Sequence, residues 1–301
     1  MAGLEGAGAR LKTQAIVTLK SLHDLDDLLA VAGLARSTYY YQLKCLEKPA
    51  KHAELKAAIT DSFKESKACY GYRKVRLDLQ AQGWTVSKKL VLKLMKELGL
   101  KTKVRRRKKY NSYQGATGKT APNLLDRQFE VAQPDTAYVS DVTEFAVAGR
   151  KLYISPVMDL FDRSILSYTF STSPSTTFTA RSLEMALGDR QFNKKLLVHI
   201  DQGMHYQHSS WRKLLAEHGA VQSMSRKGNC YDNAVMENFF GRLKTEAFYG
   251  GRVESVDELA VVLEAHIGWY NLKRRQERLK GMAPMEYRRY ALQPEAGLLF
   301  S

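Results

Sequence analysis

The sequence predicts an α/β protein in which helical units precede a mixed β-sheet that is covered by helices. Residues 15–100 carry apolar side chains at helical spacing, and glycines stand where the helical segments end. From residue 136 onward, short segments alternate apolar and polar residues and are separated by polar turns. These segments are followed by an order of strands and helices that packs most simply as helices on the faces of a mixed sheet.

The charge of the chain predicts a polyanionic partner. Its 301 residues carry a formal net charge of +16 and a pI of about 9.6, which favours nucleic acid. A merely basic surface, or one that touches anionic lipid, is the alternative. No apolar run approaches the roughly 18 residues of a membrane span, so no membrane association is expected. The chain has three cysteines that lie far apart in the sequence, which fits a reducing cytoplasm. Their spacing is not that of a zinc site.

The first helical unit is predicted over residues 15–48, after a Gly-rich segment 1–14 that we interpret as a disordered leader or tag. A short apolar helix, a turn at Gly33 and a second helix follow one another, which is typical of a helix-turn-helix. A plain helical hairpin with tyrosines in its core is the alternative. The residues expected to face a DNA groove open the second helix: Arg36, Ser37, Thr38 and Tyr40.

A second helical unit is predicted over residues 49–100. Its middle segment ends at Gly83, and Ser87 begins a last helix that ends at Gly99. This arrangement again suggests a helix-turn-helix, with Lys88 and Lys89 among the lysines on its polar side. A solvated lysine face explains the same residues.

Residues 101–133 are predicted to be a linker, because a run of basic residues is followed by polar residues with Gly, Ser and Pro. A tether that follows DNA phosphates suits this charge better than a merely solvated one. The candidate phosphate contacts are Arg105, Arg106, Arg107 and Lys108.

A catalytic core is predicted over residues 134–250, with a helical extension over 251–301. Strands are expected over residues 136–147, 151–160, 164–171, 195–201 and 220–225, and helices over 176–190, 209–219 and 231–250. Three acids stand at matching places: Asp141 on the first strand, Asp201 at the end of a buried strand and Glu237 on the long helix. Strand ends deliver side chains to a sheet edge, where sites form. Lys244 lies seven residues after Glu237, which places both on one helix face.

Several segments resemble the catalytic core of DDE transposases and retroviral integrases, and more narrowly the insertion-sequence transposases of the IS-three family. They are "SDVTEF", "HIDQGMHY", "SMSRKGNCYDNAVMENFFGRLKTE" and "WYNLKRRQERLKGMAPMEY", with "YGYRKV" in the second helical unit. Together these motifs are highly specific and cover most of the chain. The resemblance implies a ribonuclease H-like fold for residues 136–290.

The resemblance also implies a role for each acid. Asp141, Asp201 and Glu237 would be the catalytic metal ligands, and Lys244 would contact DNA beside them. Two magnesium ions, with manganese as a substitute, can activate the attacking oxygen and stabilise the leaving oxygen of a phosphodiester. Magnesium prefers carboxylate oxygens, and three acids without metal would repel one another.

The chain departs from the family pattern at positions that are not catalytic acids. Tyr138, Ile200 and Gln276 stand where the family often has Trp, Ser and His. These departures affect subgroup and substrate fit rather than the chemistry.

The function that follows is a magnesium-dependent transposase that binds the ends of its mobile element and catalyses strand cleavage and strand transfer. The expected partners are double-stranded DNA, as terminal inverted repeats and target, a second copy of the chain on paired ends and a first-frame protein. A bacterial cytoplasm, in association with the nucleoid, is the expected location. A DNA-binding regulator of transposition with an inactive core, or a stand-alone nuclease, is the alternative; the presence of all three acids and of two helix-turn-helix units argues against them.

Other polar residues near the acids have simpler interpretations. Arg226, Lys227 and Asn233 are expected to contact phosphate or the loop before Glu237. Asp232 is expected to cap the long helix. The remaining residues are expected to be hydrogen-bonded, salt-bridged, solvated or in a turn: His199, His205, His208, Glu144, Glu246, Asp159 and Asp162.

Overall fold

The computed structural model describes residues 7–47, 52–103, 120–188, 195–249 and 253–293. The chain divides into two compact units, residues 1–58 and residues 59–301. The boundary falls inside helix α4 (Ala53–Glu65). Each unit is described by itself below.

The first unit contains helices α1 (Ala9–Leu19), α2 (Leu25–Ala32) and α3 (Arg36–Glu47). Asp24 caps α2 by accepting from Asp26 N at 2.8 Å, and Gly33 ends it with φ of 56°, where a glycine has no steric penalty. Ile16, Leu28 and Tyr39 are buried together. The predicted turn at Gly33 is therefore confirmed. Helix α1, however, begins at Ala9, inside the segment that we expected to be a leader.

The helix-turn-helix-like helices of the second unit are α5 (Tyr72–Ala81) and α6 (Lys88–Glu97), which follow α4. Ser87 Oγ accepts from Leu90 N at 3.2 Å and caps α6, as its sequence position predicts. The buried side chains of Val75, Leu79 and Leu94 give this part an apolar interior. All three predicted helices are thus present.

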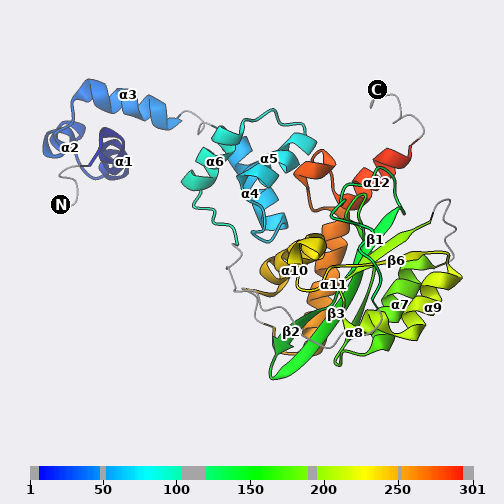
Figure 1. Ribbon diagram of the computed structural model, residues 1–301. Coiled ribbons are helices and arrows are strands. Elements are labelled where there is room, and N and C mark those ends of the chain that lie inside the picture. The colour runs from blue at the N-terminus through cyan, green and yellow to red at the C-terminus, as the bar shows by residue number, and fades with distance from the viewer. Residues whose placement is uncertain (1–6, 48–51, 104–119, 189–194, 250–252, 294–301) are drawn as a thin grey trace. The chain divides into compact units, whose positions relative to one another are not determined.

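The described strands form one mixed sheet (Figure 1). They are β1 (Ala137–Ser140), β2 (Thr143–Val147), β3 (Arg150–Asp159), β4 (Ile165–Ser171), β5 (Leu197–Ile200) and β6 (Val221–Met224). Strands β1, β5 and β6 run parallel, while β3 lies antiparallel to β1, β2 and β4. From one edge to the other the order is β4, β3, β1, β5 and β6, with β2 following β1 along the same side of β3.

The predicted strand over residues 136–147 is interrupted at Asp141 and Val142. Ser140 pairs with Val157 and Thr143 with Ile154, so β1 and β2 occupy one edge of β3 on either side of the interruption. The amide N of Val142 donates to Oδ1 of Asp141 at 2.6 Å. Because this amide bonds to a side chain, it does not continue the ladder. Asp141 therefore lies just beyond a strand end rather than within a strand.

Helices cover both faces of the sheet (Figure 1). Helices α7 (Thr176–Leu187), α8 (Met204–Gln207) and α9 (Ser209–Glu217) pack on one face around Trp211 and Tyr206. Helices α10 (Ala234–Leu243) and α11 (Val256–Leu272) pack on the other, followed by α12 (Pro284–Leu292). In β1, Ala137 and Val139 pack on the side of α10 and α11, whereas Tyr138 packs on the side of α7, α8 and α9.

The long helix predicted over residues 231–250 consists of three consecutive segments. A 3₁₀ turn, η1 (Cys230–Asn233), leads into α10, and a π-helical turn, η2 (Lys244–Phe248), follows it. Tyr249 N donates to Lys244 O at 2.7 Å, the i to i−5 bond of a π turn. Lys244 is therefore at the end of α10 and not in its middle.

The domain boundary expected at residue 250 is also wrong, because α11 belongs to the core. Its residues Leu259, Leu263 and Ile267 are buried in the same cluster as Phe239 and Leu243 of α10. Another 3₁₀ turn, η3 (Glu277–Leu279), connects α11 to α12. The apolar face of α11 completes the interior and is not an extension to it.

Candidate active site

Two neighbouring parallel strands bring Asp141 and Asp201 together. Val139 of β1 pairs with His199 of β5, and each acid lies two residues further along its strand. The same register therefore places the two acids side by side, just beyond the carboxyl ends of β1 and β5. The sequence predicted Asp201 at such a strand end, but it predicted Asp141 within the first strand.

Glu237 reaches this edge from α10. Its neighbours Met236, Phe239 and Phe240 are buried against the sheet, which fixes the first turn of the helix beside the strand ends. Glu237 is half-buried, and its charge acts on Asp141. The three predicted acids thus converge electrostatically, although each comes from a different element.

The surroundings of Asp141 and Asp201 disfavour their ionised forms. Burial raises the pKa of Asp141 well above its usual range, and the charges of Asp201 and Glu237 raise it further. The amide of Val142 and the side chain of Asn233 oppose this shift. Burial also raises the pKa of Asp201, against the amide of Gly203, which donates to Oδ1 at 2.8 Å. A bound cation would compensate the repulsion between these two carboxylates.

The donor set fits a hard divalent cation by its chemistry. Carboxylate oxygens are the ligands that magnesium prefers, and two of the three acids, both half-buried, lie side by side. Among the described residues, no three His, Cys, Asp or Glu side chains stand close enough to hold one ion as they are placed. The acids therefore fit a metal as a close pair with a third acid nearby, and not as a closed coordination shell.

Asn233 lies beside Asp141, and its expected contact with phosphate or the loop remains a prediction. Its Nδ2 donates to Oδ2 of Asp141 at 2.7 Å, and the residue is 7% exposed. The sequence also did not predict a role for Tyr206. That side chain is buried, and burial together with the charges of Asp141 and Asp201 raises its pKa. The sequence feature that could have indicated a role for Tyr206 is its place in the segment "HIDQGMHY", which also contains Asp201.

Arg226 is exposed and also binds a buried acid, so its expected contact with phosphate or the loop remains a prediction. Its Nε and Nη2 donate to Oδ2 and Oδ1 of Asp232 at 2.8 and 2.9 Å. Asp232 also accepts from Nε of Arg127 at 2.8 Å and from Nδ2 of Asn123 at 3.0 Å. Asp232 is fully buried and does not cap α10, which corrects its predicted role. Lys227 is exposed.

Two of the three histidines near Asp201, His199 and His208, have the polar roles that we favoured. Fully buried His199 contacts the hydroxyls of Ser223 and Ser225 at 2.8 and 3.0 Å, and burial lowers its pKa to about 4. His208 caps α9 by accepting from Ser210 N at 3.3 Å. Burial lowers the pKa of His205 against the opposing charge of Asp201.

Among the remaining acids, Glu144 forms an exposed ion pair with Lys151 at 3.0 Å, as expected. Asp159 and Asp162 flank the β3–β4 turn, but both are fully buried and bind Arg288 of α12. The turn was predicted, and the ion pairs were not.

Lys244 is half-buried, with Nζ lying over the ring of Phe145 at 5.4 Å from its centroid. It starts the π turn at the end of α10 and packs on β2. Its expected contact with DNA remains a prediction.

The residues expected to read DNA lie mostly on the surface. Nη1 of Arg36 is 2.7 Å from Oδ1 of Asp26, so it bridges α2 and α3. Ser37 and Tyr40 are exposed and Thr38 is half-buried. Lys88 is 3.7 Å from Glu277, and Lys89 is exposed. Arg105, Arg106, Arg107 and Lys108 lie outside the described residues.

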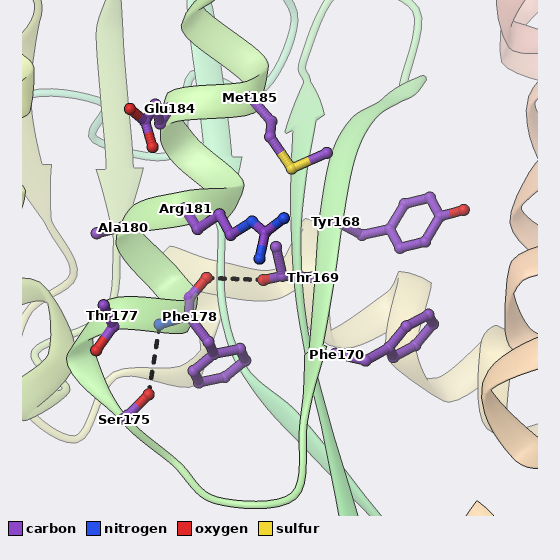
Figure 2. Close-up of a pocket in the computed structure, with 10 residues that line it drawn as sticks. All are labelled: Tyr168, Thr169, Phe170, Ser175, Thr177, Phe178, Ala180, Arg181, Glu184 and Met185. Carbon is purple, nitrogen blue, oxygen red and sulfur yellow. Dashed lines mark hydrogen bonds between the residues drawn. The ribbon is translucent and has the colours of Figure 1, made fainter. Parts of the chain in front are cut away.

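A pocket lies apart from these acids, between β4 and α7 (Figure 2). Arg181 and Glu184 of α7 and Thr169 of β4 are among its lining residues, and Thr169 Oγ1 donates to Phe178 O at 2.7 Å. None of the three candidate acids lines it.

None of the helices in the described ranges is long and apolar enough to cross a membrane.

Known protein families match both the mixed-sheet core of this chain and the helical segment that precedes it. Residues 131–230 and residues 237–292 each match the family described as integrase core domain, and residues 51–108 match the HTH-like domain. The second match includes α11, in agreement with its place in the core. The mixed sheet with helices on both faces is accordingly a ribonuclease H-like fold, as predicted.

Individual proteins are similar along most of the chain. A protein assigned as the transposase InsK of insertion sequence element IS150 from Escherichia coli K12 is 44% identical, over 92% of this chain and 97% of that protein. The transposase InsF of insertion sequence IS3A from the same organism is 29% identical, over 77% of this chain and 81% of that protein. The solved HTLV-2 integrase catalytic core domain is 13% identical, with a TM-score of 0.41, over 52% of this chain and 97% of that one. With these relatives and both domain matches, the chain belongs to the insertion-sequence transposases of the IS-three family, which are DDE polynucleotidyl transferases.

Proposed function

We propose that this transposase binds the ends of its insertion sequence and carries out metal-dependent strand cleavage and strand transfer with Asp141, Asp201 and Glu237. The observation that carries the proposal is the half-buried pair of carboxylates just beyond the ends of β1 and β5, with Glu237 beside them. A site that holds like charges so close together requires compensation, and a divalent cation supplies it.

Each acid would act as a ligand through its carboxylate oxygens. Magnesium, as two ions with manganese as a substitute, would supply Lewis-acid charge for the attacking and leaving oxygens of the phosphodiester. Asp141 and Asp201 are held by backbone amides, Val142 N at 2.6 Å and Gly203 N at 2.8 Å. These bonds fix the direction of each carboxylate, so only Glu237, on the helix, has to adjust.

The space around Asp201 also limits how its loop can fold. A Cβ atom at Gly203 would stand 2.8 Å from Oδ1 of Asp201, closer than such atoms approach. Glycine therefore permits the turn in which the amide of residue 203 reaches the carboxylate. The local chain thus prepares Asp201 for a role that needs a fixed orientation.

DNA would reach the acids through the helical units and the basic run. Ser37, Tyr40, Lys89 and Lys227 are exposed and suit contacts to a groove or to phosphates. Terminal inverted repeats, target DNA, a second copy on paired ends and a first-frame protein are the proposed partners, in a bacterial cytoplasm in association with the nucleoid. A regulator with an inactive core would not need the acids.

Strand transfer on labelled element ends tests this function. The purified protein should join end DNA to target DNA with magnesium or manganese and not with calcium or a chelator. Asp141→Asn, Asp201→Asn and Glu237→Gln should each lose joining while retaining end binding. Glu144→Gln, which changes an exposed acid on β2 in the same way, is the control. Joining at the wild-type rate by any one of the three variants would remove that acid from the site.

A further inference from the structure

A second group of buried charges lies away from the three acids, around Glu246 in η2. Its Oε1 accepts from Nη2 of Arg274 at 2.5 Å and its Oε2 from Nε at 2.8 Å. Glu246 is 9% exposed and Arg274 is 1% exposed. A bidentate pair of this kind is strong and directional, and it fixes η2 to the segment that follows α11.

The helix-turn-helix-like segment also contacts Glu246. Nζ of Lys74, on α5, lies 3.9 Å from Oε1 of Glu246. The backbone carbonyl of Glu246 accepts from Nζ of Lys103 at 3.3 Å and from Sγ of Cys69 at 3.8 Å. Glu246 therefore joins the segment around α5 and α6 to the core through both its side chain and its main chain.

Contacts next to this group hold the same two parts together. The hydroxyl of Tyr70 donates to Lys273 O at 3.2 Å and accepts from Arg275 N at 2.8 Å. The ring of Tyr70 packs on Trp269, with centroids 5.7 Å apart. Nε of Arg275 is 3.6 Å from Oδ1 of Asp78 on α5. We call this contact region between the helix-turn-helix-like segment and the core the junction. It is built from several side chains and not from one ion pair.

The junction is connected to the candidate active site along one helix. Helix α10 carries Glu237 near its start and passes directly into η2, which carries Glu246. π turns inside helices are frequent at functional sites. A displacement of the helix-turn-helix-like segment would therefore act on the element that places the third acid.

We propose that Glu246 is a positioning residue, which fixes the helix-turn-helix-like segment to the helix of Glu237 so that DNA held by that segment lies in register with the acids. The part of this inference that concerns DNA rests on the proposed function. A purely structural ion pair would affect stability alone. A positioning residue would in addition separate end binding from strand transfer.

Cys69 reports on the junction without any DNA. Burial raises the pKa of this thiol to about 11, with the charge of Glu246 as the next contribution, so the joined protein holds little thiolate. In a Cys45→Ser and Cys230→Ser background, an aromatic disulfide reagent at pH 8 should react slowly. Glu246→Gln and Arg274→Gln should react at least about tenfold faster, because an exposed thiol has a pKa of about 8.5. Glu144→Gln should match the background.

Tyr70→Phe distinguishes the effect of opening the junction from the effect of removing a charge near Cys69. It removes only the hydroxyl that bridges Lys273 and Arg275, so it changes no charge beside Cys69. It should also increase the thiol rate, by at least about threefold. This variant decides the question if Glu246→Gln does not fold.

The functional arm measures end affinity and strand transfer in the same variants. Glu246→Gln should bind end DNA within about twofold of wild type and transfer strands at least about tenfold more slowly. If folded Glu246→Gln and Tyr70→Phe keep both the wild-type thiol rate and wild-type strand transfer, the proposal is overturned. If the wild type itself transfers no strands, the proposed function fails, while the thiol rates still decide whether Glu246 holds the junction.

Discussion

The side-chain amide of Asn233 donates a hydrogen bond to Oδ2 of Asp141 at 2.7 Å. Oδ1 of Asn233 is buried and has no hydrogen-bond partner among the described residues. The amide therefore holds one carboxylate oxygen of Asp141 while Val142 N holds the other. Asn233 orients the acid, as residues behind metal ligands commonly do.

Asn233→Ala should weaken manganese binding and strand transfer by about 10- to 100-fold, because such supporting residues have effects of this size. Titration with manganese, followed by electron paramagnetic resonance, measures the affinity without DNA. Asn229→Ala is the matched control, because Asn229 accepts from Tyr231 N at 3.2 Å and does not contact the acids in the described structure. Wild-type manganese affinity in Asn233→Ala would show that the hydrogen bond does not orient the acid.

Replacing one of the acids should not lower the stability of the protein, although it should abolish strand transfer. Burial and the charge of Asp201 disfavour ionised Asp141, so Asp141→Asn should leave the melting temperature in chelator unchanged or raised. Magnesium should then raise the melting temperature of the wild type and raise that of Asp141→Asn much less. Thermal unfolding with and without magnesium measures both effects. A large loss of stability in chelator would mean that Asp141 supports the fold instead.

The strands before the first two acids could be predicted from the sequence because local patterns determine them, but the end of β1 just before Asp141 was not predicted. The apolar run before Asp201 predicted a buried strand, and the alternation before Asp141 predicted its neighbour. The parallel register then places the two acids together. Glu237 followed from the helical pattern around it.

Long-range ion pairs could not be predicted in this way. Asp232 stands where a helix cap is expected, but it is buried and binds two exposed arginines, Arg226 and Arg127, of which the second is 105 residues away in the sequence. The partner of Asp162 is Arg288, 126 residues further on. Local propensity contains no information on such partners, and the same holds for the π turn at Lys244, which depends on what η2 contacts.

Neutralising the basic run should weaken binding to all DNA sequences alike. The residues to change to glutamine are Arg105, Arg106, Arg107, Lys108 and Lys109. The slope of the logarithm of affinity against the logarithm of salt concentration should become shallower by about 0.9 for each phosphate that the variant no longer neutralises. Fluorescence anisotropy with end DNA and with unrelated DNA measures this. A weakening confined to end DNA would mean that the run reads bases.

Lys244→Ala should reduce strand transfer with little effect on the fold. Nζ lies 5.4 Å from the ring centroid of Phe145, so the loss of stability should be about 0.5–1 kcal/mol. Lys244→Met keeps the packing without the charge, and Lys244→Arg keeps the charge. Strand transfer should recover in part with Arg and not with Met, if the charge contacts DNA. Equal rates in all four proteins would limit Lys244 to its contact with Phe145.

The stability of the protein should fall as the pH falls from about 6.5 to 4, in part because of His266. Burial lowers the pKa of His266 to about 4, and the charges of Arg274, Lys67 and Lys103 act in the same direction, against that of Glu246. Between these pH values the unfolded chain binds a proton that the folded chain does not, so stability rises with pH across this range.

His266→Gln should flatten this dependence by up to about 3 kcal/mol, since each pKa unit corresponds to about 1.4 kcal/mol. Some dependence should remain, because burial also lowers the pKa of His199 to about 4. Denaturant unfolding at several pH values, followed by the fluorescence of Trp269, whose ring lies 5.3 Å from that of His266, measures the effect. His23→Gln, at an exposed position, is the control. If His266→Gln keeps the wild-type dependence, the buried imidazole is not the group that destabilises the junction in acid.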